Sequence, residues 1–290
     1  MSDRRPLVLG ALGDLVEDIR VQLSGPVNVA TDTEARIVRT RGGSAANVAV
    51  AAAAIEGRAR FIGQVGNDPI GDAMAAMLAD AGVEIAGRRG GRTGSIVVLV
   101  GADGERTMLT DRGSSHELVD PVGGWLDGIH TLHVPAYSLA VEPMAGTAAD
   151  LITQAHERAM AVSIDLSSTA LLADYGIDAF AALLARLAPA VVFANEDEAA
   201  VMVDHLDPMV DAGATVVVHG AREASARHGD ETLTRAAEPL PEPADTTGAG
   251  DAFAAGYLCA RAEGAELADA LDRGHGAARR LLTAGMRAPR

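Results

Sequence analysis

The pattern of hydrophobic and polar positions alternates along the chain between two periods, which predict strands and helices in turn. Short apolar runs bounded by turn residues predict buried strands at 6–12, 60–66, 129–135, 161–166, 190–194 and 214–219. Alanine-rich stretches predict helices from 41 to about 56, from the Asp68 cap to about 81, and over 143–159, 179–187, 196–203 and 252–262. Repeated strand–helix units indicate a parallel sheet with helices on both faces.

Two regions depart from this alternation of strands and helices, and their patterns predict strands with one solvent-facing side. Residues 19–39 form short alternating segments around Gly25-Pro26. Residues 94–101 and 106–111 read as paired strands joined by an Asp-Gly hairpin turn at 102–105. Together these regions predict a small separate sheet.

Composition limits the fold and the compartment. A chain of 290 residues with 48% hydrophobic residues supports one large α/β domain, or a main domain with a small one. Because aromatic residues make up only 3%, the core must consist of Ala, Val, Leu and Ile. The single cysteine, Cys259, is expected to be buried filler. We find no signal peptide and no long uncharged apolar run, which predicts a cytoplasmic protein without a membrane partner.

Charge excludes several classes of function. The net charge of −16 disfavours a nucleic-acid partner. All 24 basic residues are arginines, so Schiff-base chemistry, pyridoxal enzymes and the Walker-A lysine are excluded. The histidines show no metal-binding spacing, and there is no Gly-x-Ser-x-Gly elbow.

The stretch 245–253 carries the clearest chemical signal. Gly248, Ala249 and Gly250 have little or no side chain and directly precede Asp251, at the start of the predicted helix 252–262. Backbone N–H groups at a helix start attract a phosphate. Because a carboxylate repels phosphate, Asp251 would have another use there, accepting a proton from a hydroxyl that attacks the phosphate. The spacing leaves equally open an ordinary glycine turn with Asp251 as a helix cap.

Polar residues also follow several predicted strands. Asp14 and Asp18 come after the first strand, and Asp165 ends another, at the edge where open α/β sheets bind ligands. Asn47 lies inside an apolar helix, so its amide must bond either a substrate hydroxyl or a neighbouring backbone group. Arg112 either closes over a ligand or is solvated.

Asn195 and Glu198 have the spacing of a helix capping box after the strand 190–194. Alternatively, the acidic cluster 195–198 holds a hydrated magnesium ion near phosphates, because this ion prefers oxygen ligands.

Residues 42–49 with 61–68, and residues 245–253, resemble the two signatures of the ribokinase-like carbohydrate kinases of the phosphofructokinase B type. The resemblance runs in order from about residue 7 to residue 284. It implies a ribokinase-like, doubly wound, mostly parallel sheet flanked by helices, in one domain with a small β lid at about 19–41 and 93–113. It also implies ATP and magnesium as cofactors, often with a monovalent cation such as potassium. An apolar face left open on the lid strands would favour a homodimer through the lid.

The resemblance further implies roles for individual residues. Asp251 would be the catalytic base, with Gly248, Ala249 and Gly250 as the anion hole. Asp18, Gly43 and Asn47 would bind the acceptor. From their places in the sequence, we expect Asp14, Gly42, Arg112 and Asp165 to bind it as well. The nucleotide would be bound by Asn195, Gly220, Thr247, Gly248, Gly250 and His275. Magnesium would lie at Asn195 and Glu198, and the monovalent cation at Asp245 and Thr247.

Two departures from the family pattern narrow the expected function. Ser44 and Val16 stand where ribokinases proper carry a lysine and an asparagine, which argues against ribose as the acceptor. Only Gly220 remains of a Gly-x-x-Gly nucleotide motif, because Glu223 replaces its second glycine. We therefore expect an ATP-dependent kinase of a sugar or sugar-like alcohol.

Three alternatives stay open at this point. A nucleoside kinase would need an aromatic platform, for which the chain offers few candidates. A metabolite-binding relative would have lost phosphoryl transfer. A dinucleotide-dependent oxidoreductase is a more distant alternative, because the turn 248–250 lacks the third glycine of that fingerprint.

Overall fold

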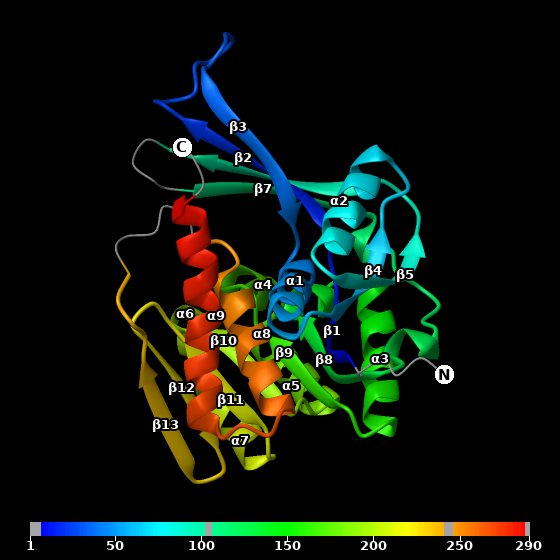
Figure 1. Ribbon diagram of the computed structural model, residues 1–290, viewed down its shortest axis with the longest axis vertical. Coiled ribbons are helices and arrows are strands. Elements are labelled where there is room, and N and C mark those ends of the chain that lie inside the picture. Colours follow the sequence, from blue (N-terminus) through cyan, green and yellow to red (C-terminus); the bar gives the residue numbers. More distant parts are fainter. Residues whose placement is uncertain (1–6, 102–105, 241–245, 288–290) are drawn as a thin grey trace.

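The computed structural model describes residues 7–101, 106–240 and 246–287, which form two sheets and the helices around them (Figure 1). The large sheet has the strand order β13-β12-β11-β10-β9-β8-β1-β4-β5. Its strands are β1 (Leu7–Leu12), β4 (Ala59–Val65), β5 (Val83–Arg89), β8 (Ile129–Pro135), β9 (Ala161–Asp165), β10 (Val191–Asn195), β11 (Thr215–His219), β12 (Glu223–His228) and β13 (Glu231–Ala236).

All neighbours from β11 to β5 are parallel, and only β12 and β13 run antiparallel. The chain proceeds from β1 outward in both directions, through β4 and β5 on one side and through β8 to β11 on the other. A reversal of strand order of this kind opens a crevice at the carboxyl ends of the strands, where ligands bind in open α/β sheets. The predicted doubly wound, mostly parallel sheet is confirmed.

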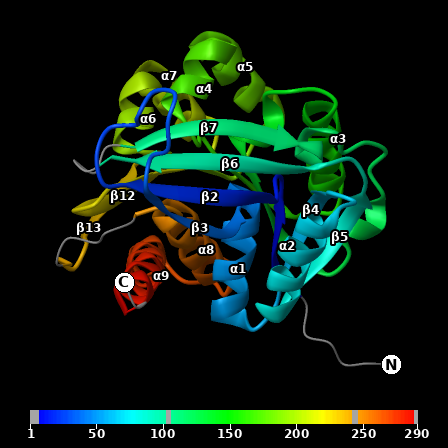
Figure 2. The same ribbon diagram turned by 90° about the horizontal axis from the view of Figure 1, so that it is seen from above.

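Helices cover both faces of the large sheet and give the molecule three layers (Figure 2). One core packs α1, α2, α8 and α9 against one face, and a second core packs α3, α5 and α7 against the other. The helices are α1 (Ser44–Glu56), α2 (Pro69–Asp80), α3 (Met144–Glu157), α4 (Thr169–Tyr175), α5 (Ile177–Leu187), α6 (Glu196–Val201), α7 (Val203–Asp211), α8 (Ala249–Ala262) and α9 (Leu267–Arg287).

Local chemistry explains the helix ends that matter for the site. Helix α1 begins after Gly43, whose φ of 101° only glycine adopts readily, and it ends at Gly57 in the left-handed conformation. Asp68 caps α2 by accepting a hydrogen bond from the Gly71 N–H at 2.8 Å, as predicted. Helix α8 is buried along most of its length, including Cys259, which is a free thiol.

The second sheet contains four strands in the order β3-β2-β6-β7. Its strands are β2 (Val16–Leu23), β3 (Ala35–Gly42), β6 (Thr93–Val100) and β7 (Arg106–Gly113). We call this element the small sheet. Because β2 follows the carboxyl end of β1, and β6 follows that of β5, the small sheet lies beyond the carboxyl edge of the large sheet (Figure 1). The predicted turn 102–105 lies outside the described residues.

Side-chain alternation gives the small sheet two different faces. The pairings β2–β3, β2–β6 and β6–β7 place Asp18, Arg20, Thr40 and Arg106 on one face, with Val98 and Val100. The opposite face carries the apolar side chains of Ile19, Val21, Leu23, Ile37, Val97, Leu99 and Leu109.

Several elements were not predicted from the sequence, among them β5, α4, α7, β12, β13 and α9. Helix α9 contains Gly274 and Gly276, which usually interrupt helices. A Cβ at position 274 would lie 2.8 Å from the Phe253 ring, so close packing between α8 and α9 requires this glycine. Strands β12 and β13 are polar on alternate positions because one face of this hairpin packs against α9 and the other is more exposed. In the described part of the chain, every helix is too short or too polar to cross a bilayer.

Candidate functional site

The carboxyl edge of the large sheet gathers the polar residues that the sequence placed after strands. Asp14 follows β1, Asp165 ends β9, Asn195 ends β10, and His219 ends β11. Asn195 and His219 are direct partners in the β10–β11 register. The start of α8 lies at this same edge, because the Gly250 Cα faces the His219 ring. The structure therefore brings the predicted strand-end residues together with the glycine turn.

Asp251 lies in the first turn of α8 and is held by two donors from α1. The Ser44 hydroxyl donates to Asp251 Oδ1 at 2.6 Å, and the Asn47 amide donates to Asp251 Oδ2 at 2.8 Å. Arg41 donates in turn to Asn47 Oδ1 at 2.7 Å. The capping alternative for Asp251 is wrong, because Gly248 is the N-cap of α8 and no side chain caps this helix. Asn47 bonds side chains here, which neither sequence alternative anticipated.

The environment of Asp251 stabilises the protonated carboxyl more than water does, so its pKa lies above that of an ordinary aspartate. Desolvation is the largest effect and raises the pKa of Asp251 to about 6, although part of the residue's surface stays exposed. The hydrogen bonds from Ser44 and Asn47 lower this pKa, the charge of Asp14 raises it, and the charge of Arg41 lowers it. A carboxyl group with a pKa close to neutral can accept and release protons at physiological pH.

The glycine turn leaves backbone donors exposed beside this carboxylate. Gly248 has a φ of 78°, in the left-handed region. The Ala249 N–H donates to the Thr246 carbonyl at 3.1 Å, so the expected set of three free amides is reduced. Within the described ranges, the N–H groups of Gly248 and Gly250 have no hydrogen-bond acceptor. These two groups remain available to an anion.

The same turn separates two neighbouring regions. A Cβ on Gly248 would lie 3.5 Å from Asn47 Nδ2 and 3.8 Å from the Leu281 side chain, toward α1 and α9. A Cβ on Gly250 would instead lie 3.0 Å from His219 Cε1, toward the ends of β10 and β11. The turn thus has one side toward α1 and the other toward the strand ends.

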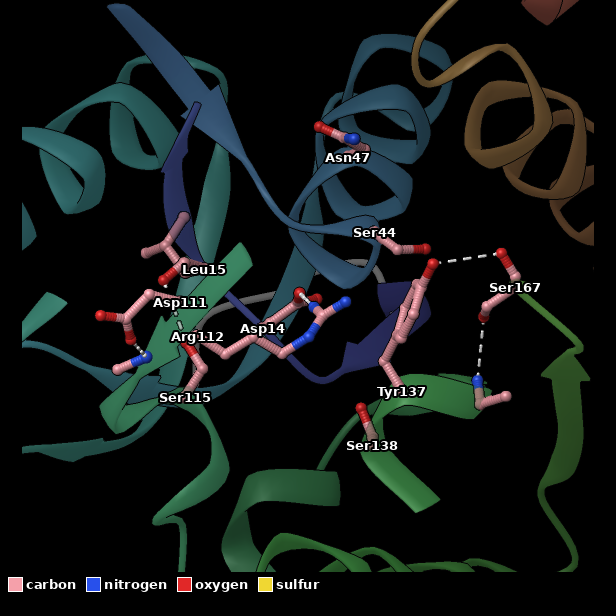
Figure 3. Close-up of polar contacts among 12 residues, drawn as sticks. Asp14, Leu15, Ser44, Asn47, Asp111, Arg112, Ser115, Tyr137, Ser138 and Ser167 are labelled. Atoms are coloured by element: carbon pink, nitrogen blue, oxygen red, sulfur yellow. Dashed lines mark hydrogen bonds and ion pairs between the residues drawn. The ribbon is translucent and has the colours of Figure 1, made fainter. Parts of the chain in front are cut away.

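Asp14 forms an ion pair with Arg112, the last but one residue of β7 (Figure 3). The side chains of both are largely buried, with exposed fractions of 5% for Asp14 and 16% for Arg112. The Arg112 guanidinium also lies 3.9 Å from the centre of the Tyr137 ring. The Tyr137 hydroxyl donates to the Ser167 carbonyl at 3.3 Å. Arg112 is therefore not solvated, and it connects the small sheet to the end of β1.

The paired glycines bring the β3–α1 junction against β1 and β2. A side chain at Gly42 would overlap the Asp18 carboxylate, and one at Gly43 would overlap the Asp14 carbonyl. Position 43 therefore requires glycine, because its neighbour is backbone and its φ is 101°, whereas a side chain at position 42 would displace the Asp18 carboxylate. This packing places Asp18 beside the start of α1, which carries Ser44 and Asn47.

A cavity of about 500 Å³ opens between the small sheet, α1 and α9. Its lining includes the Asp18, Arg20, Thr40 and Arg106 face of the small sheet and the Arg280 side of α9. Asn47 and Gly248, which both lie against Asp251, form part of its wall. The cavity is thus open to the region around the Asp251 carboxylate.

The predicted capping box at the start of α6 is confirmed. The Asn195 side chain accepts from the Glu198 N–H at 2.8 Å, and Glu198 Oε2 accepts from the Asn195 N–H at 2.8 Å. Burial raises the pKa of Glu198. The pKa of Asp165 is raised well above its usual range, chiefly by desolvation and then by the charges of Glu198 and Asp251. These carboxylates therefore lie close to one another.

Metal-binding residues are less evident. No group of three His, Cys, Asp or Glu side chains in the described ranges is arranged to hold a metal ion. A magnesium ion at Asn195 and Glu198 would therefore have few protein ligands and would be coordinated mainly by water. Thr247 is exposed, and Asp245, the other residue expected at the monovalent cation, lies outside the described residues.

Next to the ends of β10 and β11, three rings pack in series. The Phe253 ring centre lies 5.3 Å from that of His219 and 5.3 Å from that of His275. Burial lowers the pKa of His219 to about 4, so this ring is neutral at pH 7. The Gly220 N–H donates to the Glu223 carbonyl at 2.9 Å, which closes the turn into β12. His275 and Gly220 thus lie on the strand-end side of the glycine turn.

Some residues of the site were not selected from the sequence. Ser44 and Tyr137 contact predicted site residues that are distant in the chain, Asp251 and Arg112, whereas Arg41 contacts Asn47 only six positions away. Only the position of Ser44 directly after two glycines gave any signal.

Comparisons with known proteins identify the family of this chain. The family model described as "pfkB family carbohydrate kinase" matches residues 12–285. The chain is 28% identical over 274 residues to a probable fructokinase-4 of Arabidopsis thaliana, covering 89% of this chain and 83% of the relative. It is 33% identical to an ATP-dependent ribose-1-phosphate kinase of Halopiger xanaduensis, covering 78% and 76%.

Solved structures share the fold. The adenosine kinase of Sinorhizobium meliloti superposes with a TM-score of 0.84 at 24% identity, covering 97% of this chain and 94% of the other. A putative ribokinase II of E. coli in complex with ATP and Mg²⁺ gives a TM-score of 0.80 at 21% identity, covering 94% and 91%.

Proposed function

Because the chain belongs to the pfkB family of carbohydrate kinases, we propose that it transfers the γ-phosphoryl group of ATP to a hydroxyl of a sugar or sugar-like alcohol. In this proposal Asp251 is the catalytic base, and the turn 248–250 binds the migrating phosphoryl group. The predicted family is confirmed, and with it the class of phosphotransferases that use an alcohol group as acceptor.

The observation that carries the proposal is the Asp251 carboxylate beside two unbonded amides at a helix start. Asp251 is mostly ionised at pH 7, because its pKa is about 6, yet it is more basic than an ordinary aspartate. The Ser44 and Asn47 donors hold both carboxylate oxygens in place. A hydroxyl that approaches Asp251 can therefore lose its proton as the oxygen attacks phosphorus.

Charge that develops on the phosphoryl oxygens needs positive groups that are already in place. The N–H groups of Gly248 and Gly250, together with the α8 dipole, supply such a field. Since Ala249 N–H is bonded to Thr246, we assign the anion hole to the two glycines alone.

Asn195 and Glu198 are proposed to bind a magnesium ion through water, since the ion prefers oxygen ligands and keeps part of its hydration shell. Bound there, the ion would neutralise negative charge on the donor phosphates. His275 and Gly220, on the same side of the turn, are proposed to contact the nucleotide.

The small sheet is proposed to act as a lid over the acceptor. Its inner face carries Asp18 and Thr40, whose oxygens suit sugar hydroxyls, and both line the cavity with Asn47. The lining, as far as the described residues form it, contains no aromatic side chain, which favours a sugar over a nucleoside. Closure of this sheet would exclude water and limit hydrolysis of ATP.

The apolar outer face of the small sheet is proposed to pack against a second copy of the chain. Ile37 and Leu109 expose 59% and 56% of their surface on this face, which is unfavourable in a monomer. Light scattering should give the mass of a dimer, and Ile37→Asp should give the mass of a monomer. A monomeric wild-type protein at micromolar concentration would contradict this assembly.

An acceptor screen tests the proposed function. ADP formation would be measured with ATP and Mg²⁺ against pentoses, hexoses, their phosphates and nucleosides, and products would be identified by mass spectrometry. We expect turnover with one member of the sugar group. Turnover with nucleosides alone, or with no compound in any group, would contradict the proposal.

A further inference from the structure

We propose that the acceptor carries an anionic group, most simply a phosphate monoester, which is bound by the arginines of the cavity beneath the small sheet. This inference rests on the proposed kinase function and specifies its acceptor as a sugar phosphate, with one free hydroxyl at Asp251.

The charge around the cavity is opposite to that of the protein. The chain carries a net charge of −16. Among the described residues, the cavity lining nevertheless contains four arginines, Arg20, Arg41, Arg106 and Arg280, and a single carboxylate, Asp18. A concave site lined by one sign of charge raises the local concentration of ligands of the opposite sign. Because most surface of this protein repels anions, such a concentration of arginines indicates a specific anionic ligand.

The arginines come from facing walls of the cavity. Arg20 on β2 and Arg106 on β7 lie on the inner face of the small sheet, as the strand pairings show. Arg280 lies on α9, and its guanidinium forms no ion pair with any residue that the structure describes. Guanidinium groups bind phosphate through paired, charge-assisted hydrogen bonds. A phosphate between these walls would also bring the small sheet toward α9.

One cavity joins the arginines to the reacting centre, and its size fits a single small molecule. Asn47 and Gly248 line the cavity, and Asn47 Nδ2 lies 2.8 Å from Asp251 Oδ2. The volume of about 500 Å³ lies within the range of small-molecule sites. One end of an acceptor can therefore place a hydroxyl at Asp251 while its phosphate lies among Arg20, Arg106 and Arg280.

The phosphates of ATP are a less suitable source of this anion. The glycine turn separates the arginine cavity, on the Gly248 side, from the His219 side, where Gly250 faces the ends of β10 and β11. Of the residues expected to bind the nucleotide, Asn195, Gly220 and His275 do not line the arginine cavity, whereas Thr247 and Gly248, at the turn between the two sides, do. In-line transfer requires donor and acceptor on opposite sides of the migrating phosphoryl group. The arginines therefore face the acceptor.

The test compares each sugar with its own phosphate. Fructose, fructose 1-phosphate and fructose 6-phosphate, and ribose, ribose 1-phosphate and ribose 5-phosphate, would be assayed for ADP formation with the full-length protein. We expect kcat/KM for one phosphorylated acceptor to exceed that of its parent sugar by about 100-fold or more. Arg20→Met and Arg280→Met should each remove most of this preference by lowering kcat/KM for the phosphorylated acceptor, with a much smaller effect on turnover of the parent sugar.

Three controls make the outcomes distinct. Arg186→Met, on the exposed surface of α5, should change nothing. The Kd of ATP, measured by calorimetry on the same variants, should be unaffected, and a loss of ATP affinity in Arg20→Met or Arg280→Met would show that these arginines bind the donor. Preferred turnover of an unphosphorylated sugar, insensitive to both variants, would overturn the inference but leave the kinase function intact. Absence of turnover with every acceptor would contradict both.

Discussion

Two aspartates at the same edge of the sheet, Asp14 and Asp251, differ in the partners that surround them. Asp14 is paired with the Arg112 guanidinium, which also stacks on Tyr137. Asp251 is held by the neutral donors Ser44 and Asn47, and desolvation raises its pKa to about 6. A carboxylate already neutralised by a guanidinium holds structure together, whereas one held by neutral donors keeps its affinity for a proton. The first arrangement favours stability and the second favours catalysis.

The largest expected effect concerns catalysis at Asp251. Asp251→Asn keeps the shape of the side chain but cannot accept the hydroxyl proton, so kcat should fall by about 10³-fold. Acceptor affinity, measured by calorimetry, should change little. Normal turnover by this variant would show that the two aspartates do not differ in the way proposed.

The next effect concerns stability at Asp14. Arg112→Met leaves the buried Asp14 carboxylate without its cation, which should lower the free energy of unfolding by about 3–5 kcal/mol. Urea denaturation measures this loss. The exposed pair Arg88–Asp120 provides a matched control, because Arg88→Met should cost less than about 1 kcal/mol. Equal effects of the two substitutions would contradict a structural role for the buried pair.

A smaller effect of opposite sign is expected for the stability of Asp251→Asn. The folded-state pKa of about 6 lies above the ordinary value of 3.8, so ionisation of Asp251 destabilises the folded state as pH rises through this interval. At pH near 8, Asp251→Asn should therefore be more stable than wild type by about 1–3 kcal/mol. This gain should disappear near pH 4, where the wild-type carboxyl is protonated in the folded state. A variant that is less stable at both pH values would contradict the proposed cost of burying this charge.

The smallest effect tests the donors of Asp251. Ser44 donates to the ionised form, so Ser44→Ala should raise the pKa of Asp251 further. The acid limb of the kcat/KM profile should move upward by about one pH unit. Ser138→Ala, which removes a bond to the Leu12 carbonyl at the same edge, is the control and should leave the limb in place. If the acid limb moved equally in both variants, it would not report the pKa of Asp251.

Local sequence signals predicted much of the fold and part of the site. Glycines at 248 and 250, the Asp68 cap and the Asn195–Glu198 capping box are determined by neighbouring residues, so their geometry follows from short patterns. The parallel strands other than β5 were recognised because each is a short apolar run bounded by turn residues.

Contacts between distant segments could not be predicted in the same way. Arg112 meets Asp14 across 98 positions of sequence, and Asn47 meets Asp251 across 204. In both pairs, the sequence around one residue carries no signal that identifies its partner. Helix α9 was missed for a related reason, since Gly274 interrupts a helical pattern locally but fits the Phe253 ring in the folded protein.

The pH dependence of kcat/KM for the wild-type enzyme with its preferred acceptor tests the central claim most directly. If Asp251 is the base, activity should be half-maximal at a pH of about 6 and fall about tenfold for each further unit of acidity. A profile that stays level down to a pH of about 4.5 would show that no carboxyl group with the raised pKa of Asp251 takes part in the reaction.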